Sequence, residues 1–190
     1  MKNNHKYFLS EFIGSCFLVM IIVGSGLMAE QLTEDVAVRL IANTIATGAG
    51  LFVLITVFAD ISGAHFNPFV SIAMTYTGNL KSNYFPYILT AQILGCLLGV
   101  GLANFFFEHE IYELSTKSRD GIYIFVSEIV ATLGLILIIF GSMKSGKITV
   151  AASVGLYITA GYWFTSSTSF ANPAVAIART FTESLQVLII

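Results

Sequence analysis

The chain has 190 residues, of which 56% are hydrophobic and 11% are charged, and its formal net charge is −2. A soluble domain carries about 25% charged residues, so this composition excludes an ordinary soluble protein and predicts a chain that lies in lipid. The small negative net charge does not favour binding to nucleic acid, which attracts basic surfaces. Cys16 and Cys96 fall within apolar runs, where we expect buried thiols and no disulfide framework, metal site or cofactor.

Five apolar runs are long enough to cross a bilayer, which takes about 20 residues. They cover residues 7–28, 36–58, 84–107, 122–140 and 148–164. The first run is longer than the apolar region of a signal peptide and others follow, so it is interpreted as a span. The last run is the shortest, and we expect Tyr162, Trp163 and Phe164 to anchor it at the membrane interface. Gly95 and Gly99 form a G-x-x-x-G pair that favours close helix contact.

Lysine and arginine in the short loops predict the orientation, because these residues are enriched on the cytoplasmic side. One side holds Lys2, Lys6, Lys81, Lys144 and Lys147, and the other holds Arg39, Lys117 and Arg119. We therefore expect a multi-pass protein of the cell (inner) membrane with a cytoplasmic N-terminus.

A polar, turn-rich stretch occurs twice. It reads S-G-A-H-F-N-P-F-V over residues 62–70 and S-F-A-N-P-A-V over residues 169–175, and residues 67–75 and 172–180 are identical at six of nine positions. Because proline suits the first helical position, we predict half-helices over 68–77 and 173–183, each about 15 Å long. The chain then divides into a first repeat (1–107, three spans) and an incomplete second repeat (108–190, two spans). Three spans per repeat place the two copies in opposite membrane orientation.

Asn67 and Asn172 precede the prolines and are good helix N-caps. If both half-helices point their N-termini at the centre, their partial positive charges disfavour cations and protons while neutral solutes pass. A simple capping role is the plainer alternative for either asparagine. The duplication on matched half-helices favours a pore.

These motifs resemble those of the major intrinsic protein family, the aquaporins and glycerol facilitators, and the resemblance extends from Ser10 to Thr180. It implies an all-α membrane protein with an aquaporin-like inverted repeat: five transmembrane helices plus two re-entrant half-helices, with the sixth transmembrane helix missing. It also implies a passive channel for small neutral solutes in a lipid bilayer, and a homotetramer when the chain is complete. Because seven residues after Glu183 cannot form a span, we expect a truncated chain.

The resemblance also implies roles for individual residues. The pore motifs are Asn67, Pro68, Phe69, Asn172, Pro173 and Ala174. The selectivity filter comprises Thr47, Ala160, Ser169 and Val175. Pore-loop carbonyls come from Gly63, Ala64, His65, Ser167 and Thr168, together with Ser169. Structural buried acids are Glu11 and Glu128.

Three positions depart from the family pattern. Phe69 replaces an alanine and is expected to narrow or rearrange the centre. Val175 replaces an arginine, which implies a wide, weakly polar filter for water, glycerol-like polyols or metalloid hydroxides such as arsenous acid (arsenite), as in bacterial members associated with arsenic resistance. Arg179 is a possible vestibule residue, although we favour an interaction with the helix dipole and a position reaching the interface.

Three other functions are weighed against the channel. A truncated, non-conducting member of the same family is the main alternative. A membrane enzyme using His65, Glu11 or Glu128 is disfavoured because no acid–base constellation accompanies them. An ion channel is disfavoured because no ring of charges faces the expected lumen.

Overall fold

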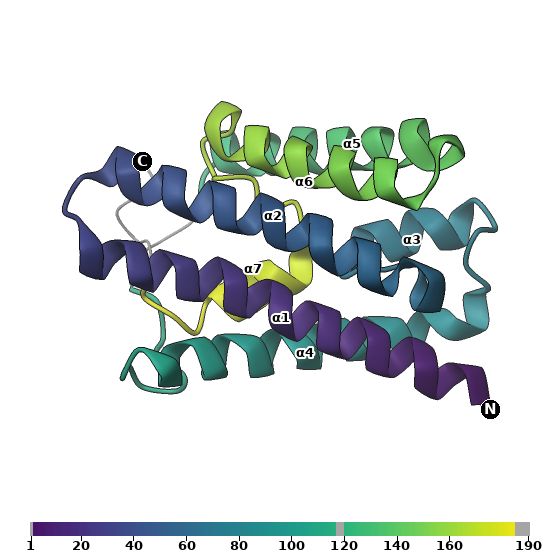
Figure 1. Cartoon of the computed structure of the whole chain (residues 1–190), viewed down its shortest axis with the longest axis horizontal. Helices are drawn as coiled ribbons and strands as arrows, with labels where there is room; N and C mark the ends of the chain where they lie inside the picture. Colours follow the sequence, from purple (N-terminus) through teal and green to yellow (C-terminus); the bar gives the residue numbers. More distant parts are fainter. Residues whose placement is uncertain (1, 117–119, 185–190) are drawn as a thin grey trace.

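The computed structural model describes residues 2–116 and 120–184, and this part of the chain is all-helical (Figure 1). In chain order the elements are α1 (Lys2–Leu32), α2 (Val36–Ser62), α3 (Pro68–Tyr76), η1 (Ser82–Tyr84), α4 (Phe85–Phe106), α5 (Ile122–Ser142), η2 (Met143–Ser145), α6 (Lys147–Phe164) and α7 (Pro173–Arg179). The two short 3-10 helices, η1 and η2, lead into α4 and α6.

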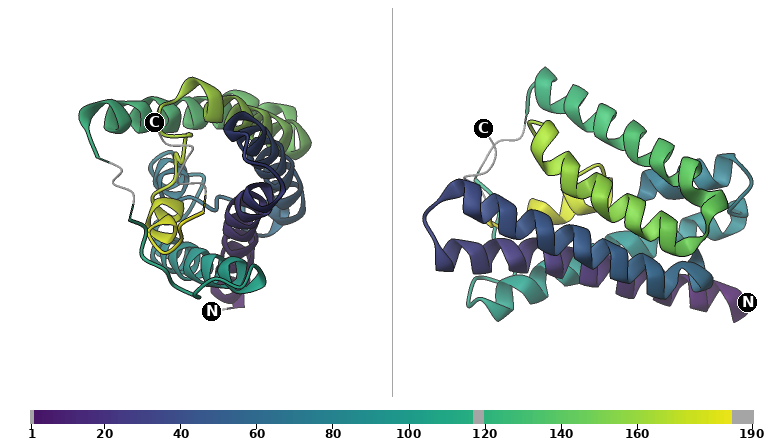
Figure 2. Two further views of the ribbon diagram at one scale, coloured as in Figure 1. Left: turned by 90° about the vertical axis from the view of Figure 1, so that its left-hand side faces the viewer. Right: turned by 45° about the horizontal axis from the view of Figure 1, so that its top comes forward.

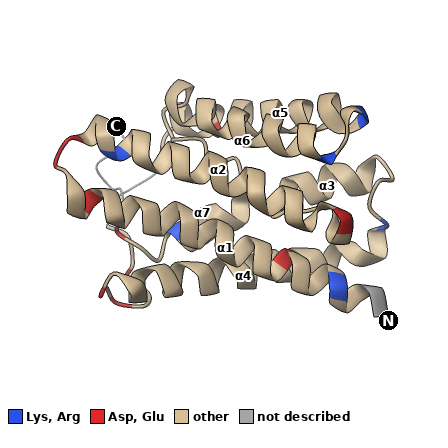
Figure 3. Ribbon diagram, viewed as in Figure 1, with Lys and Arg blue, Asp and Glu red and all other residues tan. Residues whose placement is uncertain are grey.

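Among the described residues, four helical segments are long and apolar enough to cross a membrane: Asn4–Leu32, Val36–Ser62, Ser82–Phe106 and Ile122–Ser145. Figure 3 shows that the charged residues lie mainly in the loops and near the ends of these helices. The fifth predicted span forms a helix, α6, but it is not among the four. Its use as a span therefore stays a prediction, as does the side on which the N-terminus lies.

The long helices form a curved wall around the two short ones. α1 packs against α2 and α4, α2 packs against α6, and α6 packs against α5. Viewed along the helices, this wall is open on one side, and α3 and α7 lie within its curve (Figure 2). The arrangement leaves α5 lightly covered. Only 17% of an apolar 18-residue stretch of this helix is buried inside the protein, against 56% of the corresponding stretches of α1 and α4.

Glycines bring α1 and α4 into backbone contact. A Cβ added at Gly95 would overlap the carbonyl oxygen of Phe12, and one added at Gly99 would overlap that of Cys16. The G-x-x-x-G pair therefore lies at this interface, where side chains as small as hydrogen let the two backbones approach closely.

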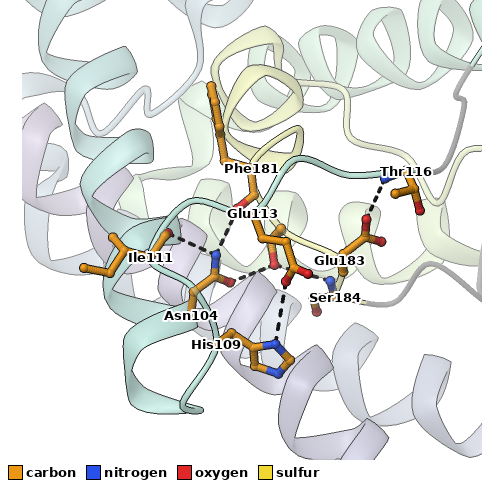
Figure 4. Close-up of polar contacts among 9 residues, drawn as sticks. Asn104, His109, Ile111, Glu113, Thr116, Phe181, Glu183 and Ser184 are labelled. Atoms are coloured by element: carbon orange, nitrogen blue, oxygen red, sulfur yellow. Dashed lines mark hydrogen bonds and ion pairs between the residues drawn. The ribbon is translucent and has the colours of Figure 1, made fainter.

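The last helix is shorter than predicted. α7 ends at Arg179 rather than at residue 183, because the following carbonyls take partners from outside the helix. Ser115 N–H donates to Thr180 O, and Glu113 N–H donates to Phe181 O at 3.3 Å. Asn104 Nδ2 donates to the same Phe181 oxygen at 2.9 Å, as Figure 4 shows. These bonds tie the segment after α7 to the loop after α4.

Candidate functional site

Each short helix begins at an Asn-Pro pair. Asn67 caps α3, with its Oδ1 accepting from Phe69 N–H at 2.9 Å. Asn172 caps α7, with its Oδ1 accepting from the N–H groups of Ala174 and Val175 at 3.1 and 3.3 Å. Proline occupies the first turn of both helices, where its missing N–H removes no helical bond.

The two asparagines also bond across to the opposite loop. Asn67 Nδ2 donates to Ala171 O at 2.6 Å, and Asn172 Nδ2 donates to Phe66 O at 2.7 Å. Both asparagine side chains are buried. Each amide therefore caps its own helix with its oxygen and holds the other element with its nitrogen, so the N-termini of α3 and α7 meet.

The loops that precede the two helices share an unusual backbone. Residues three and one before each asparagine have positive φ: Ala64 (51°) and Phe66 (49°) before Asn67, and Ser169 (51°) and Ala171 (44°) before Asn172. Non-glycine residues adopt this left-handed region only at a cost of about 1–3 kcal/mol each, so surrounding contacts must hold them.

Glu11 supplies those contacts for the first loop. Its Oε1 accepts from His65 N–H at 2.9 Å and from Ser62 Oγ at 2.6 Å. Its Oε2 accepts from Phe66 N–H at 2.7 Å and from Gln92 Nε2 at 2.8 Å. Glu11 is completely buried, which an acid tolerates when donors surround it.

Glu128 serves the second loop in the same way, with fewer partners. Its two oxygens accept from Phe170 N–H at 3.0 Å and from Ala171 N–H at 2.7 Å. The expectation that Glu128 is buried is wrong: it is only half-buried, because it lies on α5, the least covered of the long helices.

A cavity of about 370 Å³ runs past the paired asparagines. Most of its wall is aliphatic and comes from α1, α2, α5 and α6. Its polar lining residues are Thr47, His65, Asn67, Asn79, Lys147, Tyr162, Ser169 and Asn172. Lys147 lies at the start of α6 and is ion-paired with Asp60. Within the described ranges, no group of three or more histidine, cysteine or acidic residues is placed to hold a metal ion.

The comparisons with known proteins agree with this geometry. The sequence profile of the family described as "Major intrinsic protein" matches residues 1–187. The chain belongs to the major intrinsic protein family. Proteins of this family are membrane channels rather than enzymes, so the prediction that this chain has no catalytic role is confirmed.

Individual relatives support the same assignment. "Aquaglyceroporin AqpS" of Rhizobium meliloti (strain 1021) is 47% identical over 176 residues, covering 93% of this chain and 76% of the relative. "Aquaporin TIP1-1" of Arabidopsis thaliana is 32% identical over 185 residues, covering 90% and 73%. The X-ray structure of the aquaglyceroporin from Plasmodium falciparum has the same fold, with a TM-score of 0.70 at 20% identity, covering 97% of this chain and 88% of that one.

Three of the four filter residues that family resemblance implied line the cavity: Thr47, Ser169 and Val175. Ala160 does not, because it is exposed on another face of α6. Ile158 and Tyr162, four residues apart and therefore on one face, line the cavity from that helix instead. Tyr162 was expected at the membrane interface, yet it is buried and hydrogen-bonded to Thr47.

Other expected pore residues divide between the cavity and the surrounding protein. Gly63, Ala64 and His65 line the cavity, whereas Ser167 and Thr168 are buried outside it. Phe69 does not narrow the centre: it is 45% exposed and is not part of the cavity wall.

Arg179 matches the favoured expectation only in part. It lies in the last turn of α7, which suits the helix dipole, but it is buried and so does not reach an interface. Its guanidinium donates to Ser184 O at 2.7 Å and lies 5.3 Å from the ring centroid of Phe170. Phe170 lines the cavity and Arg179 does not.

Sequence reasoning missed three residues that hold the first loop in place. Gln92 Nε2 bridges Glu11 and Ser71, and Ser62 donates to Glu11. A glutamine in the middle of an apolar span was the available signal, since a buried amide must find partners. Nothing in the sequence alone pairs it with Glu11.

Proposed function

We propose that this protein is a passive transmembrane channel for small neutral solutes, with the cavity as part of its pore. The observation that carries the proposal is the reciprocal bonding of Asn67 to Ala171 O and of Asn172 to Phe66 O. It places two helix N-termini and two capping asparagines at the wall of one cavity. A capping role alone does not account for the second bond that each asparagine makes.

The wall favours neutral solutes over ions. Most lining side chains are aliphatic, and the lining lysine, Lys147, is already paired with Asp60. An ion leaving water for such a wall would lose hydration that the wall does not replace. The partial positive charge at two helix N-termini adds a barrier to cations and protons.

Water, glycerol-like polyols and metalloid hydroxides such as arsenous acid are the proposed solutes. Thr47, Ser169 and Val175 line the cavity with small, uncharged side chains, and position 175 is a valine instead of an arginine. An amphipathic polyol fits such a wall, since its C–H groups face aliphatic side chains while a few polar groups meet its hydroxyls. The relative at 47% identity carries the name aquaglyceroporin.

The membrane arrangement follows from the paired helices. We place α3 and α7 as re-entrant half-helices that enter from opposite faces and meet at Asn67 and Asn172. At 1.5 Å per residue their combined length is about 24 Å, close to the roughly 30 Å of the hydrocarbon core. Residues 1–107 and 108–190 then form two inverted repeats, with α6 as a fifth span. We also propose a homotetramer in the inner membrane with a cytoplasmic N-terminus.

A non-conducting member of the same family is the second candidate. The observation that favours it is the slight burial of α5: only 17% of its apolar stretch is buried, which leaves this side of the wall lightly covered. A pore whose wall is not closed by protein would be blocked or disordered by lipid.

Solute flux into vesicles separates the two candidates. The full 190-residue chain would be reconstituted in liposomes, and stopped-flow light scattering would follow water, glycerol and arsenous acid, with potassium flux measured alongside. The proposal predicts neutral-solute permeability above that of empty vesicles with no potassium conductance. Permeabilities equal to those of empty vesicles would favour the non-conducting member, and water conduction alone would contradict the wide filter.

A further inference from the structure

Four polar side chains connect the buried acid Glu11 to the cavity wall. Glu11 Oε2 accepts from Gln92 Nε2 at 2.8 Å, and the same nitrogen donates to Ser71 Oγ at 2.9 Å. Ser71 Oγ in turn lies 3.1 Å from His65 Nδ1. Glu11, Ser71 and Gln92 are completely buried, whereas His65 lines the cavity. We call these four residues the Glu11–His65 network.

Glu11 determines which way the Gln92 amide faces. The carboxylate already accepts from the backbone N–H groups of His65 and Phe66, and it has no hydrogen to donate. The NH2 end of Gln92 must therefore face it. Gln92 Oε1 is left buried without a partner among the described residues, and turning the amide over would set this oxygen against the carboxylate.

The orientation of Gln92 directs the hydroxyl of Ser71. Because Gln92 Nε2 is a donor, Ser71 Oγ accepts from it, and the single hydroxyl hydrogen of Ser71 needs another acceptor. Within the part of the chain that the structure describes, the contact that remains for this hydrogen is His65 Nδ1. A ring nitrogen that accepts a hydrogen bond carries no proton, so a neutral His65 holds its proton on Nε2.

Nε2 is the ring nitrogen of His65 that meets the cavity. It has no hydrogen-bond partner among the described residues, yet it is not one of their buried, unpartnered polar atoms, so it keeps contact with the cavity. It lies beside Gly63, another lining residue, where an added Cβ would be 2.8 Å away. The side-chain nitrogens of Asn67 and Asn172 already donate to the opposite loops, whereas Nε2–H is left for a solute.

We propose that Gln92 and Ser71 are positioning residues that hold His65 as the Nε2–H tautomer, so that the cavity wall presents one fixed N–H donor. Its ligands are neutral solutes with an acceptor oxygen, such as the hydroxyl of a polyol. The contact with Ser71 also prevents the ring from turning over, which would exchange its two nitrogens. This inference rests on the proposed channel function for its solute, but the state of the ring is measured without any flux.

Solid-state nitrogen NMR of the full-length protein in lipid bilayers, with labelled histidine, reports the proton position directly. The chain has three histidines, and His5→Gln and His109→Gln identify the other two sets of signals. At about pH 8, where an imidazole is neutral, we expect His65 Nε2 to be protonated and Nδ1 to be unprotonated and hydrogen-bonded. A proton on Nδ1 in the wild type would overturn the proposal.

Two variants test the network and a third is their control. Ser71→Ala removes the donor, so the Nδ1 signal should move toward that of an unbonded ring nitrogen. Gln92→Met keeps the length of the side chain but frees the Ser71 hydrogen to turn to another acceptor, so a second, Nδ1–H tautomer should appear. Ser15→Ala should leave the spectrum unchanged, because Ser15 is also completely buried but its hydroxyl has no partner among the described residues.

Glycerol permeability of liposomes shows whether the ring acts on a solute. Ser71→Ala and Gln92→Met should each lower it by about two- to tenfold, the loss of one well-oriented hydrogen bond, while Ser15→Ala should not. His65→Phe keeps an aromatic ring and removes the donor. Because Ser71 acts through His65, Ser71→Ala should have no further effect in the His65→Phe background. Additive losses would refute the positioning role.

The outcomes separate this inference from the function on which it rests. If the wild type conducts glycerol but Ser71→Ala and Gln92→Met match Ser15→Ala in spectrum and permeability, the positioning role is refuted while the channel stands. If the wild type passes no neutral solute, the channel and the solute contact fail, and the spectra still decide the state of His65. If Ser71→Ala does not fold, Gln92→Met decides, and a single unchanged tautomer refutes the network.

Discussion

Each asparagine of the two Asn-Pro pairs performs two tasks with one amide group. The oxygen of Asn67 caps α3 while its nitrogen bonds Ala171 O, and Asn172 does the same for α7 and Phe66 O. Aspartate could cap a helix but has no N–H groups to donate, and serine is too short to reach across. The residue type is therefore required by the pair of bonds together rather than by either bond alone.

The two loop-supporting acids should differ in importance. Glu11 is fully buried and accepts four hydrogen bonds, whereas Glu128 is half-buried and accepts two. We expect Glu11→Gln to lower the free energy of unfolding by about 3 kcal/mol, because two donors would then face an NH2 group, and Glu128→Gln by about 1 kcal/mol. Thermal unfolding in detergent measures both, and equal losses would contradict the assigned roles.

Phe69 should be dispensable for flux. Because its side chain is 45% exposed and lies outside the cavity wall, Phe69→Ala should leave glycerol permeability unchanged and cost less than about 1 kcal/mol of stability. Phe66→Ala is the contrasting variant. Phe66 is 1% exposed and packs edge-on against Phe58, so its loss should cost about 4 kcal/mol. Faster or slower flux in Phe69→Ala would show that this ring does reach the pore.

At the scale of elements, small residues determine how closely the long helices approach. Gly95 and Gly99 let α4 touch the backbone of α1, and Gly48 and Gly155 bring α2 close to α6 in the same manner. Because lipid tails are as apolar as the helices, the hydrophobic effect contributes little to helix association within the membrane. Close van der Waals packing of this kind is therefore a main source of that association. The cavity lies inside the wall that these contacts hold together.

Gly99→Ala should destabilise the helix pair. The added methyl group would overlap the Cys16 carbonyl oxygen, and separating α1 from α4 to make room should cost about 2 kcal/mol. Gly141→Ala on α5 is the matched control, because a Cβ there meets nothing within 4 Å and alanine favours the helix. Under the same detergent conditions, the free energy of unfolding should therefore fall for Gly99→Ala and rise for Gly141→Ala.

The sequence predicts elements better than it predicts their ends and faces. Apolar runs and Asn-Pro pairs lead to the helices and to the caps at Asn67 and Asn172, since both depend on local patterns. The end of α7 at Arg179 depends on bonds from the distant loop that holds Glu113, which no local pattern contains. Ala160 was assigned to the filter by spacing, but the rotation of α6 brings Tyr162 to the cavity.

The helices pack around a buried centre, and one side of the molecule, at α5, is only lightly covered. The amide groups of Asn67 and Asn172 are buried and hydrogen-bonded, and the cavity passes beside them. By contrast, α5 presents most of its apolar surface outward, although its partner α6 packs on one face. We expect that outward surface to meet lipid or other protein in the membrane, which accords with the proposed tetramer.

Glycerol flux through vesicles that contain Asn67→Ala or Asn172→Ala tests the paired-asparagine pore most directly. Each change removes a cap and a cross-bond, about 2 kcal/mol in stability, and separates the two helix N-termini at the cavity wall. Asn83→Ala, at an exposed asparagine in η1, is the control. The account predicts that wild type and Asn83→Ala conduct glycerol while both cavity variants fall to the level of empty vesicles. Wild-type flux in folded Asn67→Ala and Asn172→Ala proteins would contradict it.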